Sequence, residues 1–278
     1  MKSLRLTYLI ISILSIALLI LSQNQNTDQG ISYSSAYTFI PLLGGILGII
    51  KFHLSSERKQ YQPTLTIAGT FFSFALIFWA IGSMIWTYFY MNKYLEPPYP
   101  SVADLFYSSH GICWMIGILY ILRKMKANLL SDFQKISPYI ILLLVNSYIL
   151  LFQGNTVELL LKNGDPREFA RYLLNLLYTL VDIANLCLLM ICVFGKFFKR
   201  ISKALQITFV LISTGLFINY VANLIFGIQQ GLTYQHPIAK FIGAFVDYLY
   251  AIEFIFLAMA ILNIPPSNKM KESQISDT

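Results

Sequence analysis

Residues 64–91 read TLTIAGTFFSFALIFWAIGSMIWTYFYM, a stretch without a single charged side chain. An α-helix rises about 1.5 Å per residue, so about 20 apolar residues are enough to cross the roughly 30 Å hydrocarbon core of a bilayer. This stretch therefore predicts a transmembrane helix. Other apolar runs predict seven more spans, at approximately 5–22, 36–54, 102–122, 136–153, 169–195, 204–227 and 241–264.

The composition of the whole chain agrees with this interpretation. Of 278 residues, 56% are hydrophobic and 12% are charged, whereas about 25% of the residues of an ordinary soluble domain are charged. We therefore expect an all-α, polytopic membrane helix bundle of about eight transmembrane helices. Residues 1–264 would form one integral membrane domain, and residues 265–278 a short polar cytoplasmic tail.

The net charge of +7 is distributed unevenly between the two sides of the expected bundle. One side carries only Lys93, Lys162, Arg167, Arg171 and Lys240. The other side carries Lys2, Arg5, Lys51, Arg58, Lys59, Arg123, Lys124, Lys126, Lys135, Lys196, Lys199, Arg200, Lys203, Lys269 and Lys271. Because Lys and Arg favour the cytoplasmic side, both termini should be cytoplasmic, in the cell membrane. The basic surface then attracts the lipid bilayer rather than a nucleic acid.

The first span also has features of a signal peptide. Lys2 and Arg5 precede the apolar run from Leu6 to Leu21. No A-x-A-like cleavage site follows that run. We predict that residues 1–22 are retained as the first helix, with cleavage as the alternative.

No familiar catalytic or metal motif occurs in the sequence. The three cysteines, Cys113, Cys187 and Cys192, fall inside expected spans without a C-x-x-C pair, so neither a zinc site nor a disulfide framework is indicated. The sequence also lacks G-x-x-x-x-G-K-[ST], H-E-x-x-H and G-x-S-x-G. We therefore expect no enzyme, no cofactor and no metal. Gly44 and Gly48 form a G-x-x-x-G pair that predicts a close helix–helix approach.

Four ionisable residues, His110, Asp182, Asp247 and Glu253, interrupt the expected spans. A charge at the bilayer centre costs about 2.5–3.5 kcal/mol on insertion scales, so such residues usually face a protein interior or a wet cavity. Counted from the expected outer helix ends, His110 and Asp247 lie about 10 Å deep, and Asp182 and Glu253 nearly 20 Å deep. These two levels could meet around one outward-facing cavity, with Asp104 near the outer surface.

A polar stripe runs along the span at 169–195. Arg171, Asn175, Tyr178, Asp182 and Asn185 step by four and three residues and so share one helix face. That face must meet protein, water or ligand rather than lipid. Two alternatives remain open here, a hydrogen-bonded network that links helices and a path for a ligand or ion. In the next span, Asn219 and Asn223 share a face, and we expect them to bond a neighbouring helix.

Two spans repeat a pattern of an acid, a tyrosine and an ionisable residue at steps of three. The first copy is Asp104, Tyr107 and His110, and the second is Asp247, Tyr250 and Glu253. This repeat suggests an internal duplication, which occurs in many membrane bundles.

The segment 96–107, EPPYPSVADLFY, resembles the P-x-P-S-x-A-D-x-x-Y segment in the multi-pass N-terminal region of bacterial GGDEF/EAL-type signalling proteins. The segments 177–182, LYTLVD, and 245–250, FVDYLY, are similar to later helices of that region. Asn223 stands where that family has a further acid. The resemblance implies a sensory membrane module, here without the output domain that those proteins carry. The segment also has a local interpretation, with Ser101 as the N-cap of a helix and Asp104 at its positive end.

These observations favour a sensory or ligand-binding membrane module with an outward-facing polar site among the spans at 102–122, 169–195 and 241–264. It would bind a small polar or cationic ligand and signal to a separate cytoplasmic partner. The expected ligand-binding residues are Asp104, His110, Arg171, Asn175, Tyr178, Asp182, Asp247, Tyr250 and Glu253. The alternatives are a small solute or proton-coupled transporter and a structural or assembly subunit of a membrane complex.

Overall fold

A computed structural model describes residues 2–23, 30–55, 59–91, 100–124, 166–195, 198–230 and 237–266, together with residues 137, 141 and 144. The described part of the chain is helical and contains no strand. Its elements are α1 (Lys2–Gln23), α2 (Gly30–Ile49), the π-helical turn η1 (Ile50–Leu54), α3 (Pro63–Met91), α4 (Val102–Lys124), α7 (Pro166–Phe194), the 3-10 turn η3 (Phe198–Arg200), α8 (Lys203–Gln230) and α9 (Pro237–Asn263).

Five stretches of these helices are long and apolar enough to cross a membrane, which suggests a membrane-embedded protein. They are Pro63–Phe89, Val102–Arg123, Leu173–Phe194, Lys203–Phe226 and Phe245–Asn263. Arg5–Ala17 and Thr38–Leu54 form shorter apolar helices. The expected span 136–153 lies outside the described residues except for residues 137, 141 and 144, which are helical. The number of eight spans and the cytoplasmic termini therefore stay predictions, as does the tail beyond Pro266.

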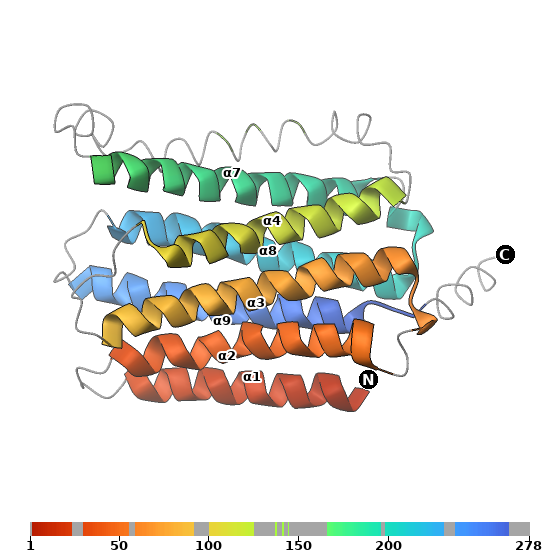
Figure 1. Ribbon diagram of the computed structural model, residues 1–278, viewed down its shortest axis with the longest axis horizontal. Helices are drawn as coiled ribbons and strands as arrows, with labels where there is room; N and C mark the ends of the chain where they lie inside the picture. The colour runs from red at the N-terminus through yellow and green to blue at the C-terminus, as the bar shows by residue number, and fades with distance from the viewer. Residues whose placement is uncertain are drawn as a thin grey trace.

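The helices lie side by side along the long axis of the molecule (Figure 1). In the view of Figure 1, α7, α4, α3, α2 and α1 follow one another from top to bottom, and α8 and α9 lie behind them. Helix α9 packs against α1, α2, α3 and α8. Helix α7 packs against α4 and α8. Helix α9 is thus the central helix of the described bundle, and the polar residues on it can meet those of several neighbours.

The G-x-x-x-G pair of α2 lies where α2 approaches α3 and α9. A Cβ atom added at Gly44 would lie 2.5 Å from the Cβ of Ala258 on α9. One added at Gly48 would overlap Ser73 on α3 and lie 2.9 Å from Ile261 on α9. The predicted close packing is therefore confirmed, because only a residue without a side chain fits at these two positions.

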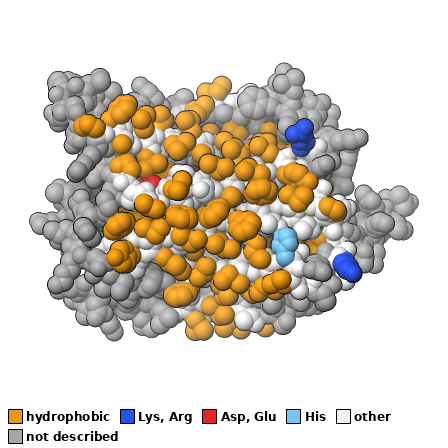
Figure 2. All heavy atoms as spheres, viewed as in Figure 1, with side chains coloured by type: hydrophobic (Ala, Val, Ile, Leu, Met, Phe, Trp, Pro, Cys, Tyr) orange, Lys and Arg blue, Asp and Glu red, His pale blue; other side chains and the backbone are white. Residues whose placement is uncertain are grey.

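Hydrophobic side chains cover much of the surface of the bundle. Figure 2 shows one face on which they extend over most of the described area. The exposed fractions of Leu105, Phe194 and Phe217 are 67%, 70% and 53%. An apolar surface of this extent is typical of a protein that contacts lipid or a partner.

One end of the bundle gathers most of the cationic residues of the described chain. The first residues of α1, α3 and α8 and the last residues of α4 and α9 lie together at this end, on the right of Figure 1. We call it the basic end, because it holds Arg5, Lys51, Lys59, Arg123, Lys199 and Lys203. The sequence predicted that all six of these residues lie on one side of the bundle.

Lys51, which the sequence placed among the cations of the more basic side, is buried in the bundle. Its side chain is 1% exposed. The ammonium group donates hydrogen bonds to the carbonyl oxygens of Ile261, Leu262 and Ile264, at 2.9, 3.1 and 2.8 Å. Lys51 therefore caps the C-terminal end of α9, where carbonyl groups have no partner within the helix.

Several helices start earlier than expected. Residues 30–35 belong to α2, although the sequence predicted an irregular segment over 23–35. Helix α7 begins at Pro166 and α9 at Pro237, three and four residues before the expected starts. Proline suits the first helical position because its missing N–H has no partner there. These earlier starts lengthen the count from the helix start for residues of α7 and α9, whereas α4 begins at Val102 as expected.

Candidate functional site

Ser101 and Asp104 cap the N-terminus of α4 through two hydrogen bonds. The hydroxyl oxygen of Ser101 accepts a hydrogen bond from the N–H of Ala103 at 3.2 Å. The Oδ2 atom of Asp104 accepts one from the N–H of Ser101 at 2.6 Å. The predicted N-cap is thus confirmed, and the geometry is that of a capping box.

Asp104 also joins α4 to α7. Its Oδ1 atom accepts a hydrogen bond from the hydroxyl of Tyr178 at 2.8 Å. Asp104 is 5% exposed, and each of its carboxyl oxygens accepts a hydrogen bond. Two of the expected ligand-binding residues, Asp104 and Tyr178, therefore satisfy each other, and this contact lies on the polar stripe of α7.

Asp182 is the centre of a network that connects α7, α8 and α9. Its two oxygens accept hydrogen bonds from the side-chain amides of Asn219 at 2.8 Å and Asn223 at 2.6 Å. The hydroxyl of Tyr250 donates to Oδ1 of Asn223 at 2.7 Å. Asn219 and Asn223 were expected to link helices, and they do so by binding Asp182, the acid of the polar stripe.

A second buried group joins α4 to α9. The Nδ1 atom of His110 lies 3.0 Å from the backbone oxygen of Ala75 on α3, so Nδ1 carries the proton that this contact requires. The opposite ring nitrogen, Nε2, lies 3.8 Å from Oε1 of Glu253. This separation is within ion-pair range but longer than a hydrogen bond.

Glu253 is the least satisfied acid of the described chain. Its side chain is 0% exposed, and neither carboxyl oxygen has a hydrogen-bond partner among the described residues. It also interacts electrostatically with Asp182. Two buried carboxyl groups are thus close enough to influence each other, and one of them lacks the donors that a buried carboxylate needs.

A cluster of aromatic rings lies beside His110. The ring of Trp79 on α3 lies 5.7 Å from that of Tyr107, 5.6 Å from that of Tyr250 and 4.2 Å from that of Phe254, measured between centroids. The His110 ring lies edge-on to Phe254 at 6.2 Å. The two repeated patterns therefore meet at α3, because both tyrosines contact Trp79 and the third members, His110 and Glu253, face each other.

The expected separation into two depths is wrong for His110 and Glu253. They were placed about 10 Å apart in depth, but Nε2 and Oε1 are 3.8 Å apart. The reason is that the two helices do not start at the same level. In Figure 1, α9 begins farther from the basic end than α4 does. The expected proximity of Asp182 and Glu253 agrees with their electrostatic interaction.

The remaining expected site residues have less definite surroundings. Asp247 is half-buried and lies within electrostatic range of Tyr250. Asn175 is half-buried, and its backbone oxygen accepts a hydrogen bond from the hydroxyl of Thr179 at 2.9 Å. Arg171 belongs to the second turn of α7, and its side chain lies outside the described residues.

Sequence reasoning missed two parts of the cluster. Trp79 carried no signal, because a tryptophan in an apolar helix is ordinary. The backbone oxygen of Ala75, which orients His110, cannot be identified from a sequence at all.

Among the described residues, no group of three or more His, Cys, Asp or Glu side chains could hold a metal ion. A comparison of the chain with protein-family models, curated proteins and solved structures finds no match.

Proposed function

We propose that the chain is a sensory or ligand-binding membrane module that binds a small cationic or polar solute at a site centred on Glu253 and Asp182. The observation that carries this proposal is Glu253, fully buried and without a hydrogen-bond donor in the described residues. The sensory part rests on the resemblance of segment 96–107 to the membrane regions of bacterial signalling proteins. Output would pass to a separate cytoplasmic partner at the basic end.

The electrostatics of the cluster favour a positive ligand. An uncompensated buried charge costs several kcal/mol, and two neighbouring carboxylates repel each other in addition. A bound cation would offset both penalties at once. The aromatic faces of Trp79, Tyr107 and Tyr250 would add attraction for an organic cation, about 0.5–2 kcal/mol for a suitably placed ring.

Each residue of the cluster has a distinct role in this proposal. Glu253 supplies charge, and Asp182 supplies the second charge while its amide partners hold it in place. Tyr250 connects Asp182 to α9 through Asn223 and would orient the ligand. His110, fixed by the oxygen of Ala75, presents Nε2 to Glu253.

The proposal is tested by titrating the purified protein with tetramethylammonium, sodium and potassium chloride at constant ionic strength, with thermal stability and calorimetry as readouts. We expect one of these cations to bind, and Glu253→Gln to weaken it by about tenfold or more, because a buried charged partner is lost. Asp104→Asn is the matched control, since that carboxyl group serves the cap and Tyr178. Equal affinity for the wild type and Glu253→Gln would reject the site.

A proton-coupled carrier is the second candidate, and the His110–Glu253 pair is the observation that favours it. A carboxyl group and an imidazole nitrogen 3.8 Å apart can exchange a proton after a small movement or through one water. Reconstituted vesicles with an internal pH dye would then acidify when a solute gradient is applied. Vesicles with the wild type and with Glu253→Gln that behave alike would exclude this mechanism.

A structural or assembly subunit is the third candidate. The contact between Asp104 and Tyr178 favours it, as does the hydrogen bond from the Asn185 amide to the backbone oxygen of Gly111 at 3.0 Å. Both join α4 to α7 without requiring a ligand. If this were the whole role of the polar residues, their substitution would lower stability and change neither binding nor flux.

A further inference from the structure

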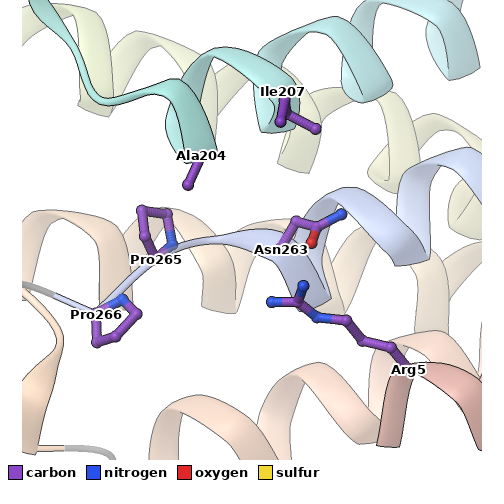
Figure 3. Close-up of a pocket in the computed structure, with 6 residues that line it drawn as sticks. All are labelled: Arg5, Ala204, Ile207, Asn263, Pro265 and Pro266. Carbon is purple, nitrogen blue, oxygen red and sulfur yellow. The ribbon is translucent and has the colours of Figure 1, made fainter. Parts of the chain in front are cut away.

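A pocket of about 250 Å³ lies at the basic end, away from the buried carboxyl cluster (Figure 3). It is formed where α1 and α8 begin and α9 ends. Its lining residues are Arg5, Ala204, Ile207, Asn263, Pro265 and Pro266. The walls are mainly apolar, and Arg5 is the single charged residue among them.

The guanidinium group of Arg5 is held so that part of it remains available. Its Nε atom donates a hydrogen bond to the backbone oxygen of Leu262 at 3.0 Å. Its two terminal nitrogens point into the pocket in Figure 3, and they have no hydrogen-bond partner among the described residues. Because Lys51 already caps the end of α9, these terminal donors are not needed there. A planar pair of such donors suits the oxygens of a phosphate group.

The surroundings of the pocket increase its positive potential. Helix α8 begins there, and the positive end of its dipole adds to the charge of Arg5. Two exposed lysines lie close in the chain, since Lys203 is the first residue of that helix and Lys199 precedes it by four residues. The described segments of the basic end contain no Asp or Glu. An anion is therefore the ligand that this pocket favours.

An apolar stripe on α8 begins in the pocket. Ile207 lines the pocket, and Val210 and Phe217 follow it on the same helix at steps of three and seven. Their exposed fractions are 54%, 48% and 53%. Ten residues of helix span about 15 Å, which is about half of the hydrocarbon core of a bilayer and so matches one leaflet. An acyl chain lying on this stripe would have its headgroup at the pocket.

We infer that this pocket binds the phosphate group of an anionic phospholipid, with Arg5 on the phosphate oxygens and one acyl chain along Ile207, Val210 and Phe217. Basic pockets between membrane helices are known to recognise lipid headgroups in this way. The site does not involve Glu253 or Asp182 and is independent of the proposed ligand.

The test measures lipid binding to the full chain in a neutral detergent, by native mass spectrometry and by thermal stability. The probes are phosphatidylglycerol, phosphatidylcholine of the same acyl chains, and inorganic phosphate. We expect phosphatidylglycerol to bind and stabilise most strongly. Arg5→Gln should weaken its binding about fivefold, the effect of one cation near a membrane surface. Arg5→Lys should weaken it less.

Two further variants make the test specific. Arg123→Gln removes an exposed arginine at the same end that does not line the pocket, and should leave binding within about twofold, as expected of a surface cation. Ala204→Phe fills the pocket while Arg5 stays intact, and should abolish the preference for phosphatidylglycerol. The inference is overturned if Arg5→Gln and Arg123→Gln have equal effects, or if Ala204→Phe binds phosphatidylglycerol normally. Equal effects of inorganic phosphate and phosphatidylglycerol would overturn the lipid as the source of the anion.

Discussion

Replacing Lys51 by methionine should destabilise the protein through the end of α9. Methionine has a similar length and fits an apolar site, so the change removes the ammonium group without creating a large cavity. The three carbonyl groups that Lys51 binds are affected unequally. The oxygen of Leu262 keeps Arg5 as a donor at 3.0 Å, and that of Ile261 keeps the N–H of Ile264 at 3.3 Å. The oxygen of Ile264 loses the donor that the structure gives it.

The expected loss follows from that difference. One buried carbonyl left without a donor costs about 1–3 kcal/mol. The ammonium group also lies 5.2 Å from the ring centroids of Phe52 and Tyr61, and each such contact contributes about 0.5–2 kcal/mol. Methionine carries no charge, so the substitution also removes the cost of burying the ammonium group, which stabilises the variant. We therefore expect the free energy of unfolding to fall by about 2 kcal/mol.

The measurement is denaturant-induced unfolding of the protein in detergent, supported by the thermal midpoint. Lys59→Met is the matched control, because Lys59 is an exposed lysine at the same end, and a surface substitution of this kind usually changes stability by less than about 0.5 kcal/mol. If Lys51→Met and Lys59→Met have the same stability, the carbonyl groups of α9 do not depend on the lysine and the reasoning is refuted.

Three other substitutions probe the packing and the cap. Gly44→Ala should cost about 1–3 kcal/mol, because its new methyl would lie 2.5 Å from Ala258; thermal unfolding checks this, and Ala258→Gly in the same chain should restore part of the loss. Tyr178→Phe should cost about 1–3 kcal/mol by removing a donor from a buried carboxyl group, and an unchanged thermal midpoint would show that water replaces the hydroxyl. Ser101→Ala should cost about 0.5–2 kcal/mol by loss of the helix cap, and faster amide exchange in the first turn of α4 is the specific readout.

The helices were largely predictable, because a helix that crosses the hydrocarbon core needs about 20 predominantly apolar residues in a row. The charge-free stretch 64–91 corresponds to α3, which the structure bounds at Pro63 and Met91. The π-helical turn at Ile50–Leu54 was not predictable, since its residues read as the continuation of α2. That turn belongs to the segment carrying Lys51, whose role depends on the distant end of α9. A contact between residues about 210 positions apart leaves no periodic pattern in either segment.

The sequence predicted which residues of the candidate site face the protein interior, but it did not predict which of them contact each other. The stripe of α7 correctly indicated a face toward protein, since Tyr178, Asp182 and Asn185 bond to α4 and α8. The pairing of His110 with Glu253 was not found, because depth was counted from helix ends that are not at one level. The stagger of neighbouring helices is set by side-chain packing, which a count along one chain does not contain.

Glu253 differs from the other buried acids, Asp104 and Asp182, in its lack of hydrogen bonds. Asp104 uses both oxygens within the fold, so its charge is explained by the helix cap and by Tyr178. Asp182 also uses both oxygens, but its donors, Asn219 and Asn223, are neutral, so any negative charge on it has no cationic partner in that network. Glu253 is fully buried, neither of its carboxyl oxygens has a donor among the described residues, and Nε2 of His110 lies 3.8 Å from its Oε1. A fold that needed only to lock helices together would gain more from an apolar residue at position 253, because replacing a buried ionic group by a packed hydrophobic one is often stabilising. The glutamate is therefore the residue whose presence most requires a function.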